Sequence, residues 1–151
     1  MVNQMISEGT LTITEHEFAA QFNALDAAML FVANSTLHLP ESAAYDLQLA
    51  CEEIFLNIIS YAYPNYIAHQ LGRIIITWAD DPVQRKTTVT FTDTGIPFNP
   101  LATDDPDLTS PLTRRRVGGL GIMLVRNKMN VVQYERLGDR NVLLITKNWD
   151  K

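Results

Sequence analysis

A carboxylate and an amide, Glu53 and Asn57, are spaced four residues apart in a segment whose apolar residues recur at helical intervals. Side chains at positions i and i+4 lie on the same face of a helix. An amide oxygen is a hard, neutral ligand suited to Mg²⁺, which also takes waters and substrate phosphates. A nearby carboxylate can orient or deprotonate a hydroxyl. The pair could therefore serve a metal-assisted transfer, although two polar residues at the edge of a buried helix give the same pattern.

The helix that would carry this pair also has an apolar stripe. If each residue is placed about 100° round the axis from the previous one, the apolar residues collect on one side. The stripe consists of Leu47, Cys51, Ile54 and Ile58, with Ala50 and Tyr61 beside it. Glu53 and Asn57 fall next to each other on one flank, whereas Glu52 falls on the far side. The geometry therefore predicts Glu53, and not Glu52, as the partner of Asn57.

A second group of candidates follows the alternating segment TTVTFT, which predicts a strand over 87–92. Asp93 comes directly after this strand, and Gly95 and Pro97 belong to the turn Asp-Thr-Gly-Ile-Pro. The glycine permits a positive φ or the close approach of a ligand, and the proline stiffens the turn. A carboxylate here could accept a hydrogen bond from an exocyclic amine such as that of adenine. An ordinary Asp-x-Gly turn is the alternative interpretation.

Three glycines within four residues mark a third candidate, at the start of a segment with helical spacing. They are Gly118, Gly119 and Gly121, with Leu120 between them. Backbone N–H groups at a helix start bind phosphate, and glycines let the phosphate come close. The sequence has no Gly-x-x-x-x-Gly-Lys loop, so a phosphate site here would not be a P-loop. A flexible hinge is the alternative, and Arg114–Arg116 before it could meet phosphates, an acidic partner or solvent.

The order of the remaining patterns predicts how these residues are brought together. Strands are expected where apolar and polar residues alternate or β-formers dominate, over 9–14, 73–79, 87–92, 131–135 and 141–147. Helices are expected over 16–36 (with Phe18, Phe22, Leu25, Met29 and Val32 as its stripe), from Pro40 to about Tyr63, and over 121–129. Residues 98–117 contain breakers and read as irregular. The order βααββαββ predicts an α+β fold with helices packed on one face of a mixed, mostly antiparallel sheet.

Composition fits one domain over residues 1–151. Apolar residues make up 46% of the chain and charged residues 19%, which is enough for a real core. The net charge of −5 argues against a general nucleic-acid binder, whose affinity comes mainly from phosphate neutralisation. The lone cysteine, Cys51, fits a reducing compartment. The first residues do not read as a signal peptide, and no apolar run approaches the roughly 20 residues of a membrane helix, so we expect a cytoplasmic protein.

Taken together, these residues resemble the GHKL ATPase superfamily, the ATP-binding fold shared by histidine kinases, Hsp90, gyrase B and MutL. Residues 53–57 match its N box, 93–97 its G1 box and 118–121 its G2 box. Within the superfamily the chain is most similar to the bacterial anti-sigma factor serine/threonine kinases of the RsbW and SpoIIAB type, which share the run at 61–63. The resemblance covers roughly residues 10–148.

The resemblance implies an α/β sandwich that holds ATP between the helices and a lid over residues 98–118. In that family Asn57 would bind Mg²⁺, Glu53 would act as general base on the attacking serine, and Asp93 would contact the adenine amine. Further nucleotide-binding residues implied by the match are Gly95, Pro97, Gly118, Gly119, Leu120 and Gly121. The implied activity is phosphorylation of a serine on a STAS-domain anti-anti-sigma protein, by a homodimer that also sequesters a sigma factor or another regulator.

Three departures from the family pattern leave the choice of partner open. Tyr61 stands where the family often has a histidine, and residues 113–116 are more basic than expected. The last strand has no threonine after a glycine for the adenine side, although Thr146 could substitute. The chain is also too short for a complete histidine kinase or for the second domains of Hsp90 and gyrase types.

Two other functions stay open from the sequence. The domain could bind nucleotide and capture a regulator as a partner-switching module without phosphorylating it. It could also be an α/β domain with no nucleotide site. The presence of Glu53 favours the kinase, because a module that only binds needs no general base.

Overall fold

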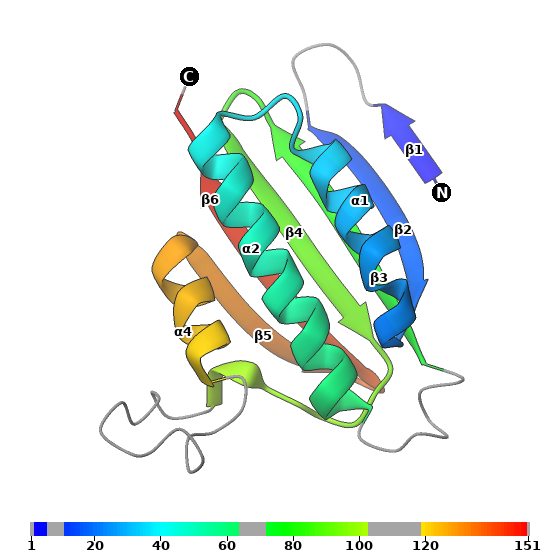
Figure 1. Ribbon diagram of the computed structural model, residues 1–151. Helices are drawn as coiled ribbons and strands as arrows, with labels where there is room; N and C mark the ends of the chain where they lie inside the picture. The colour runs from blue at the N-terminus through cyan, green and yellow to red at the C-terminus, as the bar shows by residue number, and fades with distance from the viewer. Residues whose placement is uncertain (1, 6–10, 64–71, 103–118, 151) are drawn as a thin grey trace.

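The protein folds into two layers, with helices on one side of a single sheet. The structure is a computed structural model that describes residues 2–5, 11–63, 72–102 and 119–150. Figure 1 shows the helices that lie across one face of the sheet: α1 (Leu25–Ser35), α2 (Glu41–Asn57) and α4 (Gly119–Lys128). The middle helix, α2, contacts both of its neighbours. The α+β class predicted from the order of the elements is confirmed.

The sheet has six strands in the order β1-β2-β3-β4-β6-β5. The strands are β1 (Val2–Met5), β2 (Thr12–Ala19), β3 (Arg73–Asp81), β4 (Lys86–Asp93), β5 (Val131–Leu137) and β6 (Arg140–Asn148). All the described pairings are antiparallel, and β1 is a strand that the sequence patterns did not predict. Because β4 pairs directly with β6, the end of one strand faces the start of a strand some fifty residues later.

Alternation along the central strands gives the sheet a buried face toward the helices. Every second side chain of β3 and β4 is buried, among them Ile74, Ile76, Trp78, Val89 and Phe91. The apolar stripe predicted for α2 joins the same core, because Leu47, Cys51, Ile54 and Ile58 are all buried. Each large apolar side chain removed from water contributes about 1.5–3 kcal/mol. Because this stripe faces the core, the flank of α2 that carries Glu53 remains available for a functional site.

The first strand is longer, and the first helix shorter, than the sequence predicts. β2 continues to Ala19, and α1 begins only at Leu25 after a 3₁₀ turn. Phe18 is therefore a strand residue and Phe22 lies in the turn, so neither belongs to a helical stripe. All eight residues of β2 pair with β3, and this tertiary pairing outweighs the local helical spacing. The predicted strand start at residues 9–10 lies outside the described residues.

The second helix ends in an unusual turn. α2 is followed directly by η2 (Ile58–Ala62), a π-helical turn that starts after Asn57. Turns with i→i+5 bonds are rare and are frequently found at functional sites. The helical stretch thus ends within one residue of the predicted end at Tyr63. At the other end, Pro40 is the N-cap and not a member of the first turn.

A partly buried lysine links the helical layer to the sheet. Lys147 on β6 donates from Nζ to Oδ2 of Asp46 on α2, at 2.9 Å, and to the carbonyl oxygen of Lys128 at the end of α4, at 2.7 Å. A cation near the last carbonyls of a helix satisfies one of them and opposes the helix dipole. The contact therefore holds α4 in a fixed position beside α2.

The described residues share one hydrophobic cluster, which runs from Phe18 to Ile145. None of the helices in the ranges that the structure describes is long and apolar enough to cross a membrane. The extent of the domain, 1–151 with a core of about 10–148, and its place in the cytoplasm stay predictions.

Candidate functional site

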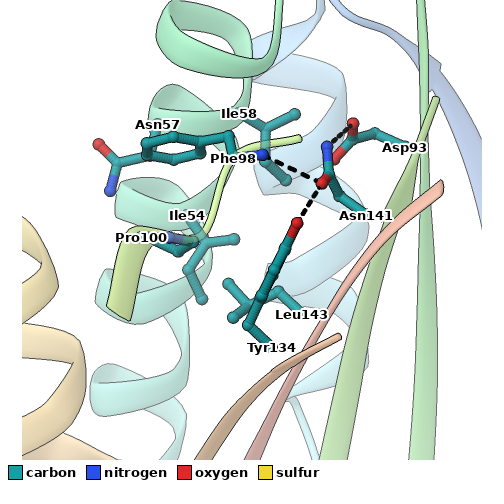
Figure 2. A pocket seen from close by; sticks show the side chains of 9 residues that line it. All are labelled: Ile54, Asn57, Ile58, Asp93, Phe98, Pro100, Tyr134, Asn141 and Leu143. Atoms are coloured by element: carbon teal, nitrogen blue, oxygen red, sulfur yellow. Dashed lines mark hydrogen bonds between the residues drawn. The ribbon is translucent and has the colours of Figure 1, made fainter. Parts of the chain in front are cut away.

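A small pocket lies between the C-terminal half of α2, the end of β4 and the start of β6 (Figure 2). We name it the α2–β4 pocket. Its lining residues are Ile54, Asn57, Ile58, Asp93, Phe98, Pro100, Tyr134, Asn141 and Leu143. Its volume is about 10 Å³, which is room for about one water molecule. Asn57 from the helical pair and Asp93 from the turn therefore border the same space.

Among the described residues, the buried side chain of Asn57 has no hydrogen-bond partner. The residue is 7% exposed, and the hydrogen bonds of the described residues include none to its amide. Figure 2 shows the Asn57 amide pointing away from Asp93 and Asn141. An unpaired buried amide costs about 1–3 kcal/mol. The fold thus retains a polar group that a ligand could satisfy.

Glu53 lies one turn before Asn57 and reaches the start of α4. A Cβ atom placed on Gly121 would overlap Oε2 of Glu53 and come within 3.0 Å of its Cδ. Burial raises the pKa of the Glu53 carboxyl above its ordinary value, and repulsion from Glu52 raises it further. A carboxylate with a raised pKa is a better proton acceptor near neutral pH. Glu52 is exposed, so only one carboxylate of the two lies against α4.

The turn after β4 holds the Asp93 carboxylate from one side. Asp93 is 3% exposed, and its Oδ1 accepts hydrogen bonds from the Gly95 N–H and from Nδ2 of Asn141, both at 2.9 Å. Burial raises the pKa of the Asp93 carboxyl, while these bonds and the charge of Arg136 lower it. The described residues offer no donor to Oδ2. This oxygen remains an acceptor for a group that enters the pocket.

Asn141 is a site residue that the sequence analysis missed. It lies on β6 directly opposite Asp93 and is 3% exposed. The sequence shows only an asparagine at the start of the apolar segment NVLLI. This pattern indicates a site residue only once β4 is known to pair with β6. Tyr134 and Phe98, which bond to Asn141, were missed for the same reason.

Residues 18–147 match a protein family described as the histidine kinase-like ATPase domain. The chain belongs to this family. The matched span contains α2, the end of β4 and the start of α4, and therefore all three groups of candidate residues. An ATPase domain binds ATP, so ATP is the nucleotide that the family implies for this protein.

The fold of this ATPase domain is similar to a crystal structure of the RsbU and RsbW domains of Rv1364c from Mycobacterium tuberculosis. The TM-score is 0.63 over 92% of this chain, at 11% sequence identity. This chain spans 33% of the length of that chain, and a likeness at such low identity concerns the fold alone. No curated protein matches the sequence.

The residues of this ATPase domain fit Mg²⁺ only in combination with phosphate oxygens. The described part of the chain contains no group of three or more His, Cys, Asp or Glu side chains that could hold a metal ion. Magnesium bound with nucleotides takes one or two protein oxygens and completes its shell with waters and phosphates. The unpaired amide of Asn57 can supply one such oxygen, so the donor set fits a nucleotide-bound ion.

Phe98 and Pro100 form the outer wall of the α2–β4 pocket. The Phe98 ring stacks on Tyr61 with centroids 5.0 Å apart. Because the pocket holds about one water molecule, it has no room for a purine ring in this arrangement. Pro97 is exposed and does not line the pocket. The rest of the predicted lid, 103–118 with Arg114–Arg116 and Gly118, lies outside the described residues.

The glycine cluster opens a helix, as its pattern predicts. Gly119, Leu120 and Gly121 form the first turn of α4. Their backbone lies where N–H groups are not used by helical bonds, which is the arrangement that binds phosphate. Contact with a phosphate stays a prediction for all three residues.

Thr146 lies toward the opposite end of β6 from Asn141. It pairs with Thr88 on β4 and Val131 on β5, about five residues along β6 from Asn141. At 3.3–3.4 Å per residue this places it roughly 17 Å from the pocket. Its hydroxyl lies 3.3 Å from Oγ1 of Thr88 instead. The strand carries Thr146 to the far end of the ladder from Asp93, which argues against the suggestion that it substitutes for the family threonine.

Substitution of Gly121 by alanine is expected to reduce ATP-dependent activity without unfolding the protein. The new Cβ would push the Glu53 carboxylate aside, and misplacement of a reacting group by about 1 Å can cost roughly 10²-fold in rate. Stability should hold or rise, because alanine has a higher helix propensity than glycine, by up to about 1 kcal/mol. Rates and thermal unfolding of Gly121→Ala would be compared with Gly121→Ala/Glu53→Asp, whose shorter carboxylate escapes the overlap. Wild-type rates in the single variant would contradict the contact.

Substitution of Gly95 by alanine is expected to loosen the turn that carries Asp93. A Cβ here would overlap the carbonyl oxygen of Ala62, which accepts the Ile96 N–H at 2.9 Å. Forcing backbone apart costs about 1–3 kcal/mol. Gly138→Ala is the comparison: its φ of +60° makes alanine cost about 1–2 kcal/mol, but no atom lies within 4 Å. Titration calorimetry with Mg-ADP should show lost affinity for Gly95→Ala only, and equal losses would contradict this assignment.

Proposed function

We propose that the protein is an ATP-dependent serine/threonine protein kinase of the anti-sigma regulatory type. It phosphorylates a serine on a STAS-domain anti-anti-sigma partner and sequesters a sigma factor or another regulator, as a homodimer in the cytoplasm. One observation supports this most directly. The Glu53 carboxylate, with its raised pKa, lies against the first turn of α4 and one helical turn from the unpaired amide of Asn57.

The proposed reaction depends on positioning and charge neutralisation, as phosphoryl transfer generally does. Asp93 accepts a hydrogen bond from the adenine amine and fixes the base of the nucleotide. Asn57 holds Mg²⁺, which neutralises phosphate charge when it is bound. The first turn of α4 directs N–H groups at the phosphates. Glu53 takes the proton of the serine hydroxyl while the serine oxygen bonds to the γ-phosphorus of ATP. The bond between the γ-phosphorus and the β–γ bridging oxygen breaks, which releases ADP.

The test is a transfer assay with radiolabelled ATP and Mg²⁺. The substrate would be the STAS-domain protein encoded nearest to this gene, and the expected product is phosphoserine on that protein. Chelation of Mg²⁺ should abolish the signal. No label on any STAS-domain partner, with nucleotide binding intact, would contradict the kinase assignment.

The same experiment separates the second candidate, a nucleotide-binding module that captures a regulator without phosphorylating it. That function predicts a stoichiometric complex with the partner on size-exclusion chromatography and no transferred label. Nothing in the geometry favours it over the kinase, because the partly buried carboxylate beside α4 has no role in mere capture.

A further inference from the structure

The side-chain amide of Asn141 uses all of its hydrogen-bonding capacity around the α2–β4 pocket. Nδ2 donates to Oδ1 of Asp93 at 2.9 Å and to the carbonyl oxygen of Ile96 at 2.8 Å. Oδ1 accepts the N–H of Phe98 at 3.2 Å and the hydroxyl of Tyr134 at 2.5 Å (Figure 2). An asparagine amide has two donor hydrogens and one carbonyl oxygen with two lone pairs, so no capacity is left.

These partners fix which way round the amide lies. The Phe98 N–H can only donate and the Ile96 carbonyl can only accept, so a flipped amide would oppose both. The group that faces Asp93 is therefore always the NH₂. Together with the Gly95 N–H, it supplies two donors to Oδ1, which favours the ionised carboxylate and leaves Oδ2 as an acceptor.

A ligand that enters the pocket must then offer a donor to Asp93. Oδ2 is buried and has no donor among the described residues, and an unsatisfied buried acceptor is penalised. A purine with an exocyclic amine at position 6 satisfies it. A purine with a carbonyl at that position places a second acceptor against the carboxylate.

We propose that Asn141 is a positioning residue that selects an amino-purine over an oxo-purine, because it holds Asp93 as a pure acceptor at the end of the pocket. The inference rests on the proposed function only in requiring that the site binds a purine nucleotide. Asn141 also ties residues 96 and 98, at the start of the outer wall, to β6.

The test measures binding of Mg-ADP and Mg-IDP by titration calorimetry. Its readout is the dissociation constant of Mg-IDP divided by that of Mg-ADP. A charge-assisted hydrogen bond gained with one base and lost with the other predicts a ratio of about 10–100 in the wild type. Because the experiment measures nucleotide binding and not phosphoryl transfer, it tests this inference even if the protein shows no kinase activity. A wild type that binds neither nucleotide overturns the inference and the proposed nucleotide site together.

Asn141→Asp is the decisive variant, because it keeps the shape and replaces the NH₂ by an oxygen. Two adjacent carboxyls share one proton, so the pair titrates with a raised apparent pKa. At pH 8 the shared proton is lost and repulsion between the two carboxylates should turn Asp93 out of its position, so we expect the ratio to fall to about 1–3. At pH 5.5 the ratio should recover several-fold, because the shared proton restores a donor between the two residues. Among the described residues, the other titratable groups around Asp93 are Tyr63, directly after η2, and Tyr134 and Arg136 on β5. A purely structural role would give a ratio that does not depend on pH.

Two further variants keep the test decisive. Asn130→Asp makes the same change at an exposed asparagine that bonds to the Asn148 N–H, and it should keep the wild-type ratio at both pH values. Tyr134→Phe removes only one donor to the Asn141 oxygen, so it should fold and lower the ratio about 3–10-fold. A wild-type ratio in folded Asn141→Asp at pH 8, or in Tyr134→Phe if Asn141→Asp does not fold, would overturn the proposal.

Discussion

Replacement of Asn57 by alanine is expected to lower phosphoryl transfer by about 10³-fold, because the loss of a metal ligand removes several kcal/mol of transition-state charge stabilisation. The same change should not destabilise the protein. The amide is buried and unpaired among the described residues, so its removal deletes a polar group that the folded state does not satisfy. The unfolding midpoint without nucleotide should therefore stay level or rise while activity collapses.

The measurements are the transfer rate at saturating Mg-ATP and thermal unfolding of nucleotide-free protein. Asn23→Ala serves as the matched control, because Asn23 is exposed on the turn before α1. It should leave both quantities unchanged. If Asn57→Ala loses activity and stability in parallel, the amide is a structural group and the metal assignment is wrong.

Replacement of Glu53 by glutamine is expected to lower transfer by about 10²–10⁴-fold, the usual contribution of a general base, with Mg-ADP affinity preserved. The wild-type rate should fall as the pH drops through the Glu53 pKa, which lies above its ordinary value of 4.5. That acid limb should vanish in the variant. Since folding raises this pKa, the Glu53 contribution to stability is present at low pH and is lost as pH rises, so glutamine should not destabilise the protein at pH 7.

Glu52→Gln is the matched control on the same helix. Glu52 is exposed and raises the Glu53 pKa by repulsion, so its neutralisation should leave the rate plateau intact and move the acid limb to lower pH. An unchanged rate in Glu53→Gln would remove the proposed base. A shift of the acid limb in Glu52→Gln without any effect of Glu53→Gln would point to another carboxyl.

Local spacing was sufficient for the helical part of the site. The i, i+4 geometry and the apolar stripe placed Glu53 and Asn57 on one flank of α2, and the alternation of TTVTFT placed Asp93 at the end of a strand. These features depend on neighbours within about one turn of helix or a few residues of strand, which the sequence displays directly.

Features that depend on pairing between distant segments were not predictable in this way. The role of Asn141 follows from its register opposite Asp93, and β2 is a strand because β3 pairs with it along its whole length. The side chains of Tyr61 and Phe98 meet across a gap of more than thirty residues. Single-sequence patterns carry no record of which strand lies beside which.

The π-helical turn η2 has a consequence for how this chain can change. Its last residue, Ala62, has a carbonyl oxygen that accepts the Ile96 N–H, so the wide turn anchors the loop that carries Asp93. Deleting one residue there could restore ordinary α-helical winding, but it would rotate Ala62 by about 100° and release the loop. This segment can therefore have either regular α-helical geometry or the contact that anchors the loop with Asp93, but not both. Insertions or deletions that restore regular helical geometry should be poorly tolerated.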